Sequence, residues 1–193
     1  MRCAYCYNAD IVYAKNGSQT LGDVLEFLKT RIGLLDAVVL SGGEATTHNL
    51  VEFCKEVKKL GFKIKLDTNG TNPSQVKQLV EKQLLNYIAL DYKAPQNKFQ
   101  TITKSNKYNT FSKTLEYLLD AEIDFEVRTT LHADLLDEED INEIILDLRV
   151  RGYQNSYYIQ KFMPTETNIG NLPTPTKQFD KNLLDGGLDI VFR

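Results

Sequence analysis

Short apolar segments and stripes of apolar residues at helical spacing alternate along most of the chain, and this rhythm limits the fold more than any other sequence feature. Five segments are typical of β-strands: residues 37–40, 62–66, 87–90, 124–127 and 157–159. Strands separated by helices pair in parallel through right-handed crossovers. The sequence therefore predicts a single α/β domain over residues 1–193, either a barrel or a doubly wound sheet.

Local signals place several helix ends. Thr20 precedes an apolar stripe that runs from Leu21 to Ile32, so it is placed to cap a helix there. Gly61 follows a second stripe as a helix-ending residue, and Asn72–Pro73 is a favourable cap and first-turn pair for a third. We also expect His48 to be part of a helix start.

Polar residues recur at the end of each predicted strand. In a (β/α) barrel the loops after the strands converge on one mouth, where ligands bind. Loops are polar in any α/β protein, but here five consecutive strands carry charged or amide side chains at the same offset. These side chains are Glu44, Asp67, Thr68, Asp91, Lys93, Arg128, Thr130 and Gln160.

The cysteines narrow the chemistry. Cys3 and Cys6 form a C-x-x-C pair, which is weakly specific by itself. A zinc site needs four ligands, and the rest of the chain offers only Cys54, His48 and His132. A thioredoxin-like pair follows a strand, and no strand precedes this one. Cys54 lies on an apolar helical stripe and is expected to be a buried thiol, whereas His132 lies in a loop and could contact a ligand.

Taken together, the motifs resemble those of a known family. R-C-x-Y-C at residues 2–6 followed by S-G-G-E at 41–44 resembles the radical S-adenosylmethionine (SAM) superfamily. The segments 66–73 and 89–95 are similar to those of glycyl-radical-enzyme activating proteins, above all those of anaerobic ribonucleoside-triphosphate reductase. The resemblance implies a partial (β/α) TIM-like barrel with about five parallel strands present and the first strand absent.

The resemblance also implies a [4Fe–4S] cluster held by three cysteines, with Cys3 and Cys6 as the second and third ligands. Thiolates suit iron–sulfur ligation. The first cysteine is expected four residues before Cys3, ahead of Met1. Three explanations stay open: a reading frame started at an internal methionine, a truncated chain, or true loss of the cluster. We expect the first. Ala45 stands where the family usually has proline.

SAM is the second implied cofactor, bound through its amino and carboxylate groups to the open iron and cleaved by one electron to a 5′-deoxyadenosyl radical. By resemblance, Tyr5 packs near the adenine, and the edge formed by Gly42, Gly43 and Glu44 bonds the amino group. A monovalent cation at the SAM carboxylate is implied for Asp67, Thr68 and Asp91, with Lys93 beside it. The ribose and carboxylate side is implied for Arg128, Thr130 and Gln160.

The function implied is generation of a glycyl radical on a partner enzyme, with flavodoxin or ferredoxin as the electron donor. Two alternatives remain: a radical SAM enzyme with a small-molecule substrate, similar to 7-carboxy-7-deazaguanine synthase, or a cluster-free SAM-binding descendant. The formal charge of −3 gives no electrostatic reason to expect nucleic acid or anionic membrane as a partner. No apolar run approaches the roughly 20 residues that span a bilayer, so we expect a cytoplasmic protein. An open sheet edge at Val38–Leu40 is expected to favour self-association.

Overall fold

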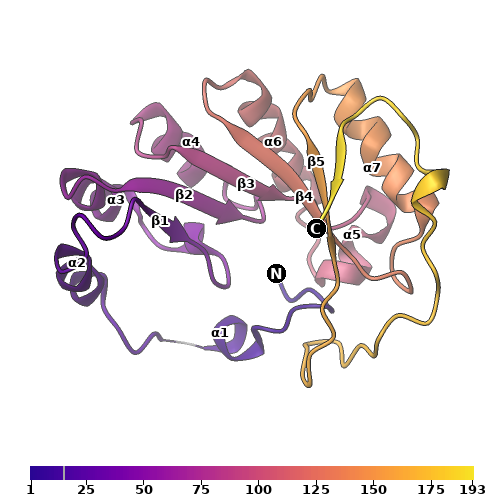
Figure 1. Cartoon of the computed structure of the whole chain (residues 1–193), viewed down its shortest axis with the longest axis horizontal. Coiled ribbons are helices and arrows are strands. Elements are labelled where there is room, and N and C mark those ends of the chain that lie inside the picture. The colour runs from indigo at the N-terminus through magenta and orange to yellow at the C-terminus, as the bar shows by residue number, and fades with distance from the viewer. Residues whose placement is uncertain (15) are drawn as a thin grey trace.

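The computed structural model describes residues 1–14 and 16–193, and its centre is one parallel sheet. The strands follow one another across the sheet in chain order, and they are β1 (Ala37–Leu40), β2 (Lys63–Thr68), β3 (Tyr87–Asp91), β4 (Phe125–Leu131), β5 (Tyr157–Lys161) and β6 (Ile190–Phe192). β1 and β6 are the two edges, so the sheet is arched but not closed (Figure 1). The predicted parallel α/β fold of the partial-barrel type is confirmed.

The number of strands expected from the sequence was too low. β6 is only three residues long, and it follows a segment whose regular structure, in the part of the chain described, is a single 3-10 turn, η2 (Lys181–Leu183). No helical stripe precedes β6 to mark it as another unit of the rhythm. Its pairing with β5 nonetheless extends the sheet, with Tyr157 opposite Ile190.

Helices lie on both sides of the arch (Figure 1). They are α1 (Ala9–Tyr13), α2 (Leu21–Lys29), α3 (Val51–Lys59), α4 (Pro73–Glu81), α5 (Gln96–Thr103), α6 (Tyr108–Asp120) and α7 (Glu138–Val150), with the 3-10 turn η1 (Ala45–Thr47). Figure 1 shows α3, α4, α6 and α7 along that outer side, and the N-terminal segment with α1 on the opposite side. Among the described residues, no helix is both long and apolar enough to cross a membrane.

The predicted helix caps are present. Thr20 forms a capping box with Asp23, whose backbone nitrogen donates to Thr20 Oγ1 at 3.1 Å. Asn72 Oδ1 accepts from the backbone of the first turn of α4, and Gly61 after α3 has a φ of +90°. Two expectations were wrong. α2 ends at Lys29, before Ile32, and His48 lies between η1 and α3 rather than in a helix start.

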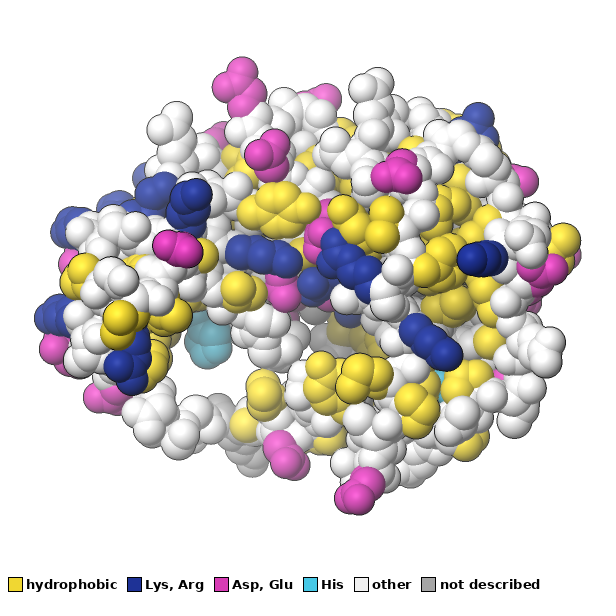
Figure 2. All heavy atoms as spheres, in the orientation of Figure 1, with side chains coloured by type: hydrophobic (Ala, Val, Ile, Leu, Met, Phe, Trp, Pro, Cys, Tyr) yellow, Lys and Arg dark blue, Asp and Glu magenta, His cyan; other side chains and the backbone are white. Residues whose placement is uncertain are grey.

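Each strand presents two chemically different faces, because successive side chains of a strand point to opposite sides. The face under the helices is apolar and almost fully buried, and its members include Ile64, Leu66, Ile88, Leu90, Val127 and Ile159. The alternate positions carry charged and polar groups, including Lys65, Asp67, Asp91, Glu126, Arg128 and Gln160. Figure 2 shows basic and acidic side chains gathered at the middle of the face that is turned away from the helices.

The β1 edge is apolar and open. β1 pairs on one side only, with β2, and Val39 is 54% exposed. Leu34 and Leu35, just before the strand, are also exposed. An unpaired edge of this kind invites pairing with another chain, so the expectation of self-association stays a prediction with a structural basis.

Candidate functional site

A pocket of about 360 Å³ lies at the carboxyl ends of the strands, within the size range typical of small-molecule sites. The residues that the resemblance implies for the cluster, SAM and the cation all line it: Cys3, Tyr5, Cys6, Gly42, Gly43, Glu44, Asp67, Thr68, Asp91, Lys93, Arg128, Thr130 and Gln160. Parallel strands end at the same edge of a sheet, and this geometry brings together residues that lie far apart in the sequence.

Further residues complete the lining and were missed from the sequence. They are Met1, Tyr7, Asn8, Val12, Ser41, Asn69, Lys161, Phe162 and Met163. Most of them stand within two positions of a motif residue, which was the available signal. Tyr7 and Met163 are more than half exposed, so apolar side chains flank the mouth of the pocket.

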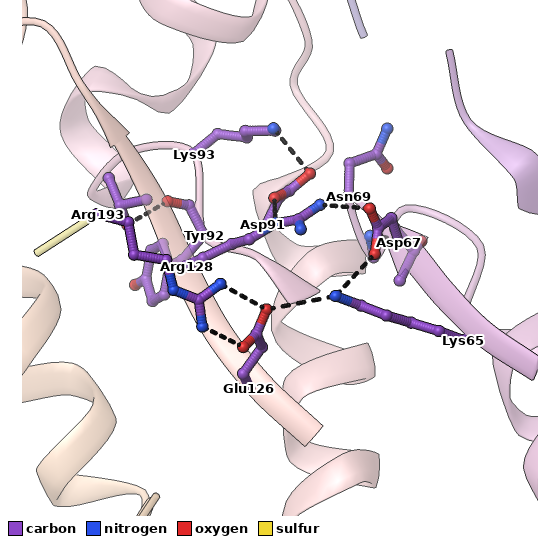
Figure 3. A network of polar contacts seen from close by, with 12 residues as sticks. Lys65, Asp67, Asn69, Asp91, Tyr92, Lys93, Glu126, Arg128 and Arg193 are labelled. Atoms are coloured by element: carbon purple, nitrogen blue, oxygen red, sulfur yellow. Dashed lines mark hydrogen bonds and ion pairs between the residues drawn. The ribbon is translucent and has the colours of Figure 1, made fainter. Parts of the chain in front are cut away.

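Arg128 joins the two acidic strand ends. Asp91 and Arg128 are directly opposite each other in the β3–β4 register, and Arg128 Nε lies 2.5 Å from Asp91 Oδ1. Arg128 Nη2 also lies 3.2 Å from Asp67 Oδ2, and Lys93 Nζ lies 2.8 Å from Asp91 Oδ2 (Figure 3). These side chains are only 13–17% exposed, so the carboxylates and their cationic partners form a largely desolvated network.

This network shifts the pKa of its members. Burial by itself would raise the pKa of Asp91, but Lys93 and Arg128 together hold that pKa below its usual value of 3.8. Burial by itself would lower the pKa of Lys93, but Asp91 and then Cys3 raise it. The pKa of Arg128 is raised in the same way by Asp91 and Asp67. Both cations and the Asp91 carboxylate therefore stay charged at neutral pH.

The network continues down the sheet. Lys65 Nζ lies 3.6 Å from Asp67 Oδ1 and 3.7 Å from Glu126 Oε1, and Arg193 Nη2 lies 2.8 Å from Glu126 Oε2 (Figure 3). Positive and negative side chains thus alternate from Lys93 to Arg193, and they come from the three strands β2, β3 and β4 and from the residues just after β3 and β6. Sequence reasoning missed this part, although the polar alternate positions of β2 and β4 were a visible signal.

Glu44 fastens the end of β1 to the end of β2. Its Oε1 accepts from the Thr46 hydroxyl at 2.6 Å and the Thr68 hydroxyl at 2.8 Å, and its Oε2 accepts from the Asn69 backbone nitrogen at 2.7 Å. The same carboxylate caps η1. The Thr68 hydroxyl is also fully used within the protein, because it donates to Glu44 and its oxygen accepts a hydrogen bond from the Gly70 nitrogen at 3.1 Å. The Glu44 carboxylate therefore acts within the protein.

The Gly42–Gly43 edge stands immediately before this carboxylate. Gly42 has a φ of +117°, a backbone conformation that favours glycine. An added Cβ at either glycine would approach only the Ile11 side chain and backbone, at 3.7–4.0 Å. The backbone at this edge is thus open for a close approach by a ligand. On the far side of the pocket, Thr130 and Gln160 are opposite each other in the β4–β5 register.

Cys3 and Cys6 belong to a single turn, which we call the cysteine loop (residues 3–6). The Cys6 nitrogen donates to the Cys3 carbonyl at 3.0 Å, and both thiols are free. Burial raises the pKa of the Cys3 thiol, while Lys93 and the terminal amino group act in the opposite direction. Two free thiols on one turn beside a basic side chain fit as part of the ligand set of an iron–sulfur cluster.

Two buried polar atoms at the pocket lack a hydrogen bond within the described part of the protein, although Lys65 Nζ lies 3.6 Å from one of them, Asp67 Oδ1. The Tyr5 hydroxyl and Asp67 Oδ1 are buried without a hydrogen-bond partner among the described residues. Buried polar groups are normally hydrogen-bonded, and an exception needs an explanation. Burial raises the pKa of Tyr5 well above its usual value, so its hydroxyl stays neutral and can donate. A ligand with an acceptor group would satisfy the Tyr5 hydroxyl, so the pocket suits a polar ligand.

Other candidate ligands lie elsewhere. Cys54 is 0% exposed on α3, and burial raises its pKa to about 11, so it is the inert buried thiol that the apolar stripe predicted. His132 does not line the pocket. Its Nε2 donates to the Pro173 carbonyl at 3.0 Å, and its Nδ1 accepts from the Asp134 nitrogen at 3.3 Å. His132 therefore binds the segment of the chain that follows β5, and it does not contact the pocket.

The residues expected to hold a monovalent cation have partners inside the protein. Asp67 and Asp91 face Arg128 and Lys93, and the Thr68 hydroxyl is bonded to Glu44. In the described part of the chain, no group of three or more His, Cys, Asp or Glu side chains could hold a metal ion. A cation at this position would have to displace Arg128, and the expectation stays a prediction.

Comparison with known proteins adds a family. The profile of the radical SAM superfamily matches residues 1–149. A curated protein of Methanocaldococcus jannaschii, named as a candidate glycyl-radical enzyme activating enzyme, is 29% identical over 188 residues, which cover 91% of this chain and 75% of that protein.

Solved structures share the fold at low sequence identity. Streptococcus suis SuiB bound to S-adenosylmethionine has a TM-score of 0.76 at 13% identity and covers all of this chain. Native anSMEcpe with bound AdoMet has a TM-score of 0.69 at 16% identity over 91% of the chain. The chain spans about half the length of these two, 47% and 52%. A domain of a pyruvate-formate lyase-activating enzyme from Bacteroides vulgatus has a TM-score of 0.58 at 17% identity, covering 68% of this chain and 87% of that domain.

Proposed function

This chain belongs to the radical SAM superfamily, and we propose on that premise that it is an oxidoreductase that activates a glycyl-radical enzyme. The observation that carries the proposal is the meeting of Cys3, Cys6 and the strand-end side chains in one pocket. The name of the Methanocaldococcus jannaschii relative supports the same reaction class. We propose anaerobic ribonucleoside-triphosphate reductase as the partner because of the motif resemblance in segments 66–73 and 89–95.

We propose that SAM occupies the pocket along the strand ends. The open backbone of Gly42 and Gly43 suits the amino group, because carbonyl oxygens of a strand end can accept from it. Lys93 and Arg128 supply positive charge for the carboxylate, and the unpartnered Tyr5 hydroxyl offers a buried donor. Thr130 and Gln160 are neighbours in the β4–β5 register on the far side of the pocket, and their polar side chains suit the ribose hydroxyls.

Cys3 and Cys6 would supply two of the three thiolates that hold a [4Fe–4S] cluster, and the third is expected four residues before Cys3. When bound, that cluster supplies the single electron that cleaves SAM to methionine and a 5′-deoxyadenosyl radical. The protein's own contribution is placement. Cys3 and Tyr5 are almost fully buried, which keeps water away from this side of the pocket. Lys93 favours the Cys3 thiolate electrostatically.

A protein substrate suits the mouth of the pocket. The exposed side chains of Tyr7 and Met163 flank it, and apolar groups of this kind are common where proteins dock. The radical would take a hydrogen atom from the Cα of one glycine, which leaves 5′-deoxyadenosine and a glycyl radical on the partner. Flavodoxin or ferredoxin is our proposal for the electron donor, and the cytoplasm is our proposal for the location.

The test uses the chain extended so that a cysteine stands four residues before Cys3, with the cluster reconstituted without oxygen. It is mixed with SAM, a one-electron reductant and anaerobic ribonucleoside-triphosphate reductase. We expect 5′-deoxyadenosine by chromatography and a glycyl-radical signal by electron paramagnetic resonance, in equal amounts. A partner whose radical glycine is replaced by alanine is the matched control and should give no such signal.

Two outcomes would contradict the proposal. Formation of 5′-deoxyadenosine without a radical on any glycyl-radical enzyme would point to a small-molecule substrate. Absence of both SAM binding and SAM cleavage in the reconstituted, extended chain would refute the site itself.

A further inference from the structure

The cysteine loop is held by a segment that follows it by more than 160 residues. The Ile169 nitrogen donates to the Cys6 carbonyl at 2.9 Å, and the Gly170 nitrogen donates to the Ala4 carbonyl at 2.7 Å. On its other side, the Ala4 nitrogen donates to the Ile102 carbonyl at 3.0 Å, in the last turn of α5. Ala4 is thus bonded on both sides, between α5 and the segment after β5.

We propose that the 168–172 segment is a clamp that fixes the cysteine loop, and that Gly170 is the positioning residue on which this clamp depends. A Cβ added at Gly170 would lie 2.8 Å from Ala4 Cβ, 2.9 Å from Ala4 O and 3.0 Å from Ala4 Cα. Two of these three atoms belong to backbone, which cannot rotate away. Any larger residue at 170 would therefore push the segment off the cysteine loop.

The requirement for glycine at position 170 is one of space. Gly170 does not have a positive φ angle, whereas Gly42, Gly61 and Gly70 do. Alanine would fit the backbone conformation of Gly170 and would fail only because of Ala4. This distinction makes the position testable by a change in the neighbour as well as in the glycine.

The segment is built to hold its own shape. Asn168, 6% exposed, accepts from the Leu172 nitrogen at 2.7 Å through Oδ1 and donates to the Leu172 carbonyl at 2.9 Å through Nδ2. The Asn171 nitrogen donates to the Asn168 carbonyl at 3.1 Å, which closes a turn. A preshaped turn presents the two amides of residues 169 and 170 in fixed directions, as a clamp on two carbonyls requires.

The clamp affects the positions of the Cys3 and Cys6 thiols. The clamped carbonyls belong to Ala4 and Cys6, so the bonds lie on either side of Tyr5 and beside both cysteines. Ligand thiolates must be held in a defined geometry for a cluster to bind tightly. The long connection after β5 therefore has a task beyond returning the chain to β6, in keeping with the general rule that long irregular connections are functional.

The experiment measures the accessibility of each thiol in the 193-residue chain without cofactors, so its outcome is independent of the proposed reaction. Iodoacetamide labelling is followed in time, and mass spectrometry assigns the label to Cys3, Cys6 or Cys54. In Gly170→Ala, we expect Cys3 to react on the order of tenfold faster, because local opening of a strained contact exposes a thiol that is now buried. Cys54 is fully buried and becomes reactive only when the whole protein unfolds, so it serves as the internal control and should react at an unchanged rate.

Gly186→Ala is the matched control. It lies in the same connection, and an added Cβ there would meet nothing within 4 Å, so labelling should equal that of the unchanged chain. Ala4→Gly combined with Gly170→Ala should restore part of the protection, because it removes the atom at 2.8 Å. Equal Cys3 rates in Gly170→Ala and Gly186→Ala would overturn the proposal, and so would a parallel rise of Cys3 and Cys54.

If Gly170→Ala does not fold, Asn168→Ala decides the question. It adds no atoms and removes both side-chain bonds to Leu172, so it should loosen the clamp and speed labelling of Cys3 in the same direction. An unchanged Cys3 rate in that variant would equally overturn the proposal.

Discussion

Glu44 Oε2 lies 2.7 Å from the backbone nitrogen of Asn69, so the carboxylate that follows β1 is bonded to the residue that follows β2. The other carboxylate oxygen, Oε1, accepts hydrogen bonds from the hydroxyls of Thr46 and Thr68. Because Gly43 directly precedes Glu44, these bonds also fix the Gly42–Gly43 edge. The effect of Glu44 on a ligand is therefore expected to pass through the position of that edge.

Replacement of Glu44 tests this arrangement. Glu44→Ala should lower the free energy of unfolding by about 3 kcal/mol, because several donors lose a charged acceptor. SAM binding, which we expect to be weak but measurable without the cluster, should weaken further. Denaturant unfolding and calorimetry measure the two effects. Thr47→Ala is the control, since its hydroxyl donates only to the Glu44 main-chain carbonyl. Equal SAM affinity in the two variants would contradict the prediction.

Arg128 tests whether the acidic strand ends need a metal cation. Replacing K⁺ by tetramethylammonium should change SAM affinity in the unchanged protein by no more than roughly twofold, because Arg128 and Lys93 already pair with the carboxylates. In Arg128→Ala, K⁺ should strengthen SAM binding, since Asp67 Oδ2 and Asp91 Oδ1 lose their cationic partner. Calorimetry at constant ionic strength measures both. Strong K⁺ dependence of the unchanged protein would instead support the cation site that the resemblance implies.

Asp91 should make the free energy of unfolding fall as the pH is lowered below 3.8. Its pKa is lowered in the folded protein, so its contribution is fully present above the usual value of 3.8 and is lost as the pH falls through the lower folded value. Asp91→Asn should cost about 3 kcal/mol at neutral pH, because it leaves buried cations without their partner. It should also flatten the loss of stability below pH 3.8. Urea unfolding at several pH values measures this, with exposed Asp120→Asn as a control that should behave like the unchanged protein.

The cysteines should divide into two kinds. In the extended chain with a cysteine four residues before Cys3, reconstitution should give about four irons per chain. Cys3→Ala and Cys6→Ala should abolish both the iron and SAM cleavage, whereas Cys54→Ala should leave them nearly intact. The 193-residue chain itself should reconstitute poorly, because two thiolates hold such a cluster weakly. Iron analysis and detection of 5′-deoxyadenosine decide it, and equal rates of cleavage by the short and extended chains would contradict the assignment.

Much of this architecture could be predicted because it is encoded locally. The strand β2 follows from the alternation of lysine and apolar residues, β3 follows from a short apolar run, and the cap at Thr20 follows from the apolar helical stripe that begins at Leu21. Most of the candidate residues could be named because they stand at strand ends, and parallel strands align their ends, whereas Cys3, Tyr5 and Cys6 were named from the motif resemblance. That general geometry predicts one shared pocket for the strand-end residues from Glu44 to Gln160.

The parts that were missed depend on contacts between distant segments. β6 is too short to give a periodic signal, and it exists because β5 offers it an edge. The bond between Gly170 and Ala4 joins segments more than 160 residues apart, and no local pattern marks it. The ion pairs of Arg128 with Asp67 and Asp91 likewise depend on how far side chains extend between neighbouring strands.

The two-faced strands also determine which changes in length the chain can tolerate. Successive side chains alternate, so deletion of a single residue within β2 would move Lys65 and Asp67 under the helices and turn Leu66 toward the pocket. One such event would destroy the core and the site together. Insertions between α5 and α6, or near Gly186, would leave that alternation intact. Natural variation in length should therefore accumulate in the connections and spare the interiors of the strands.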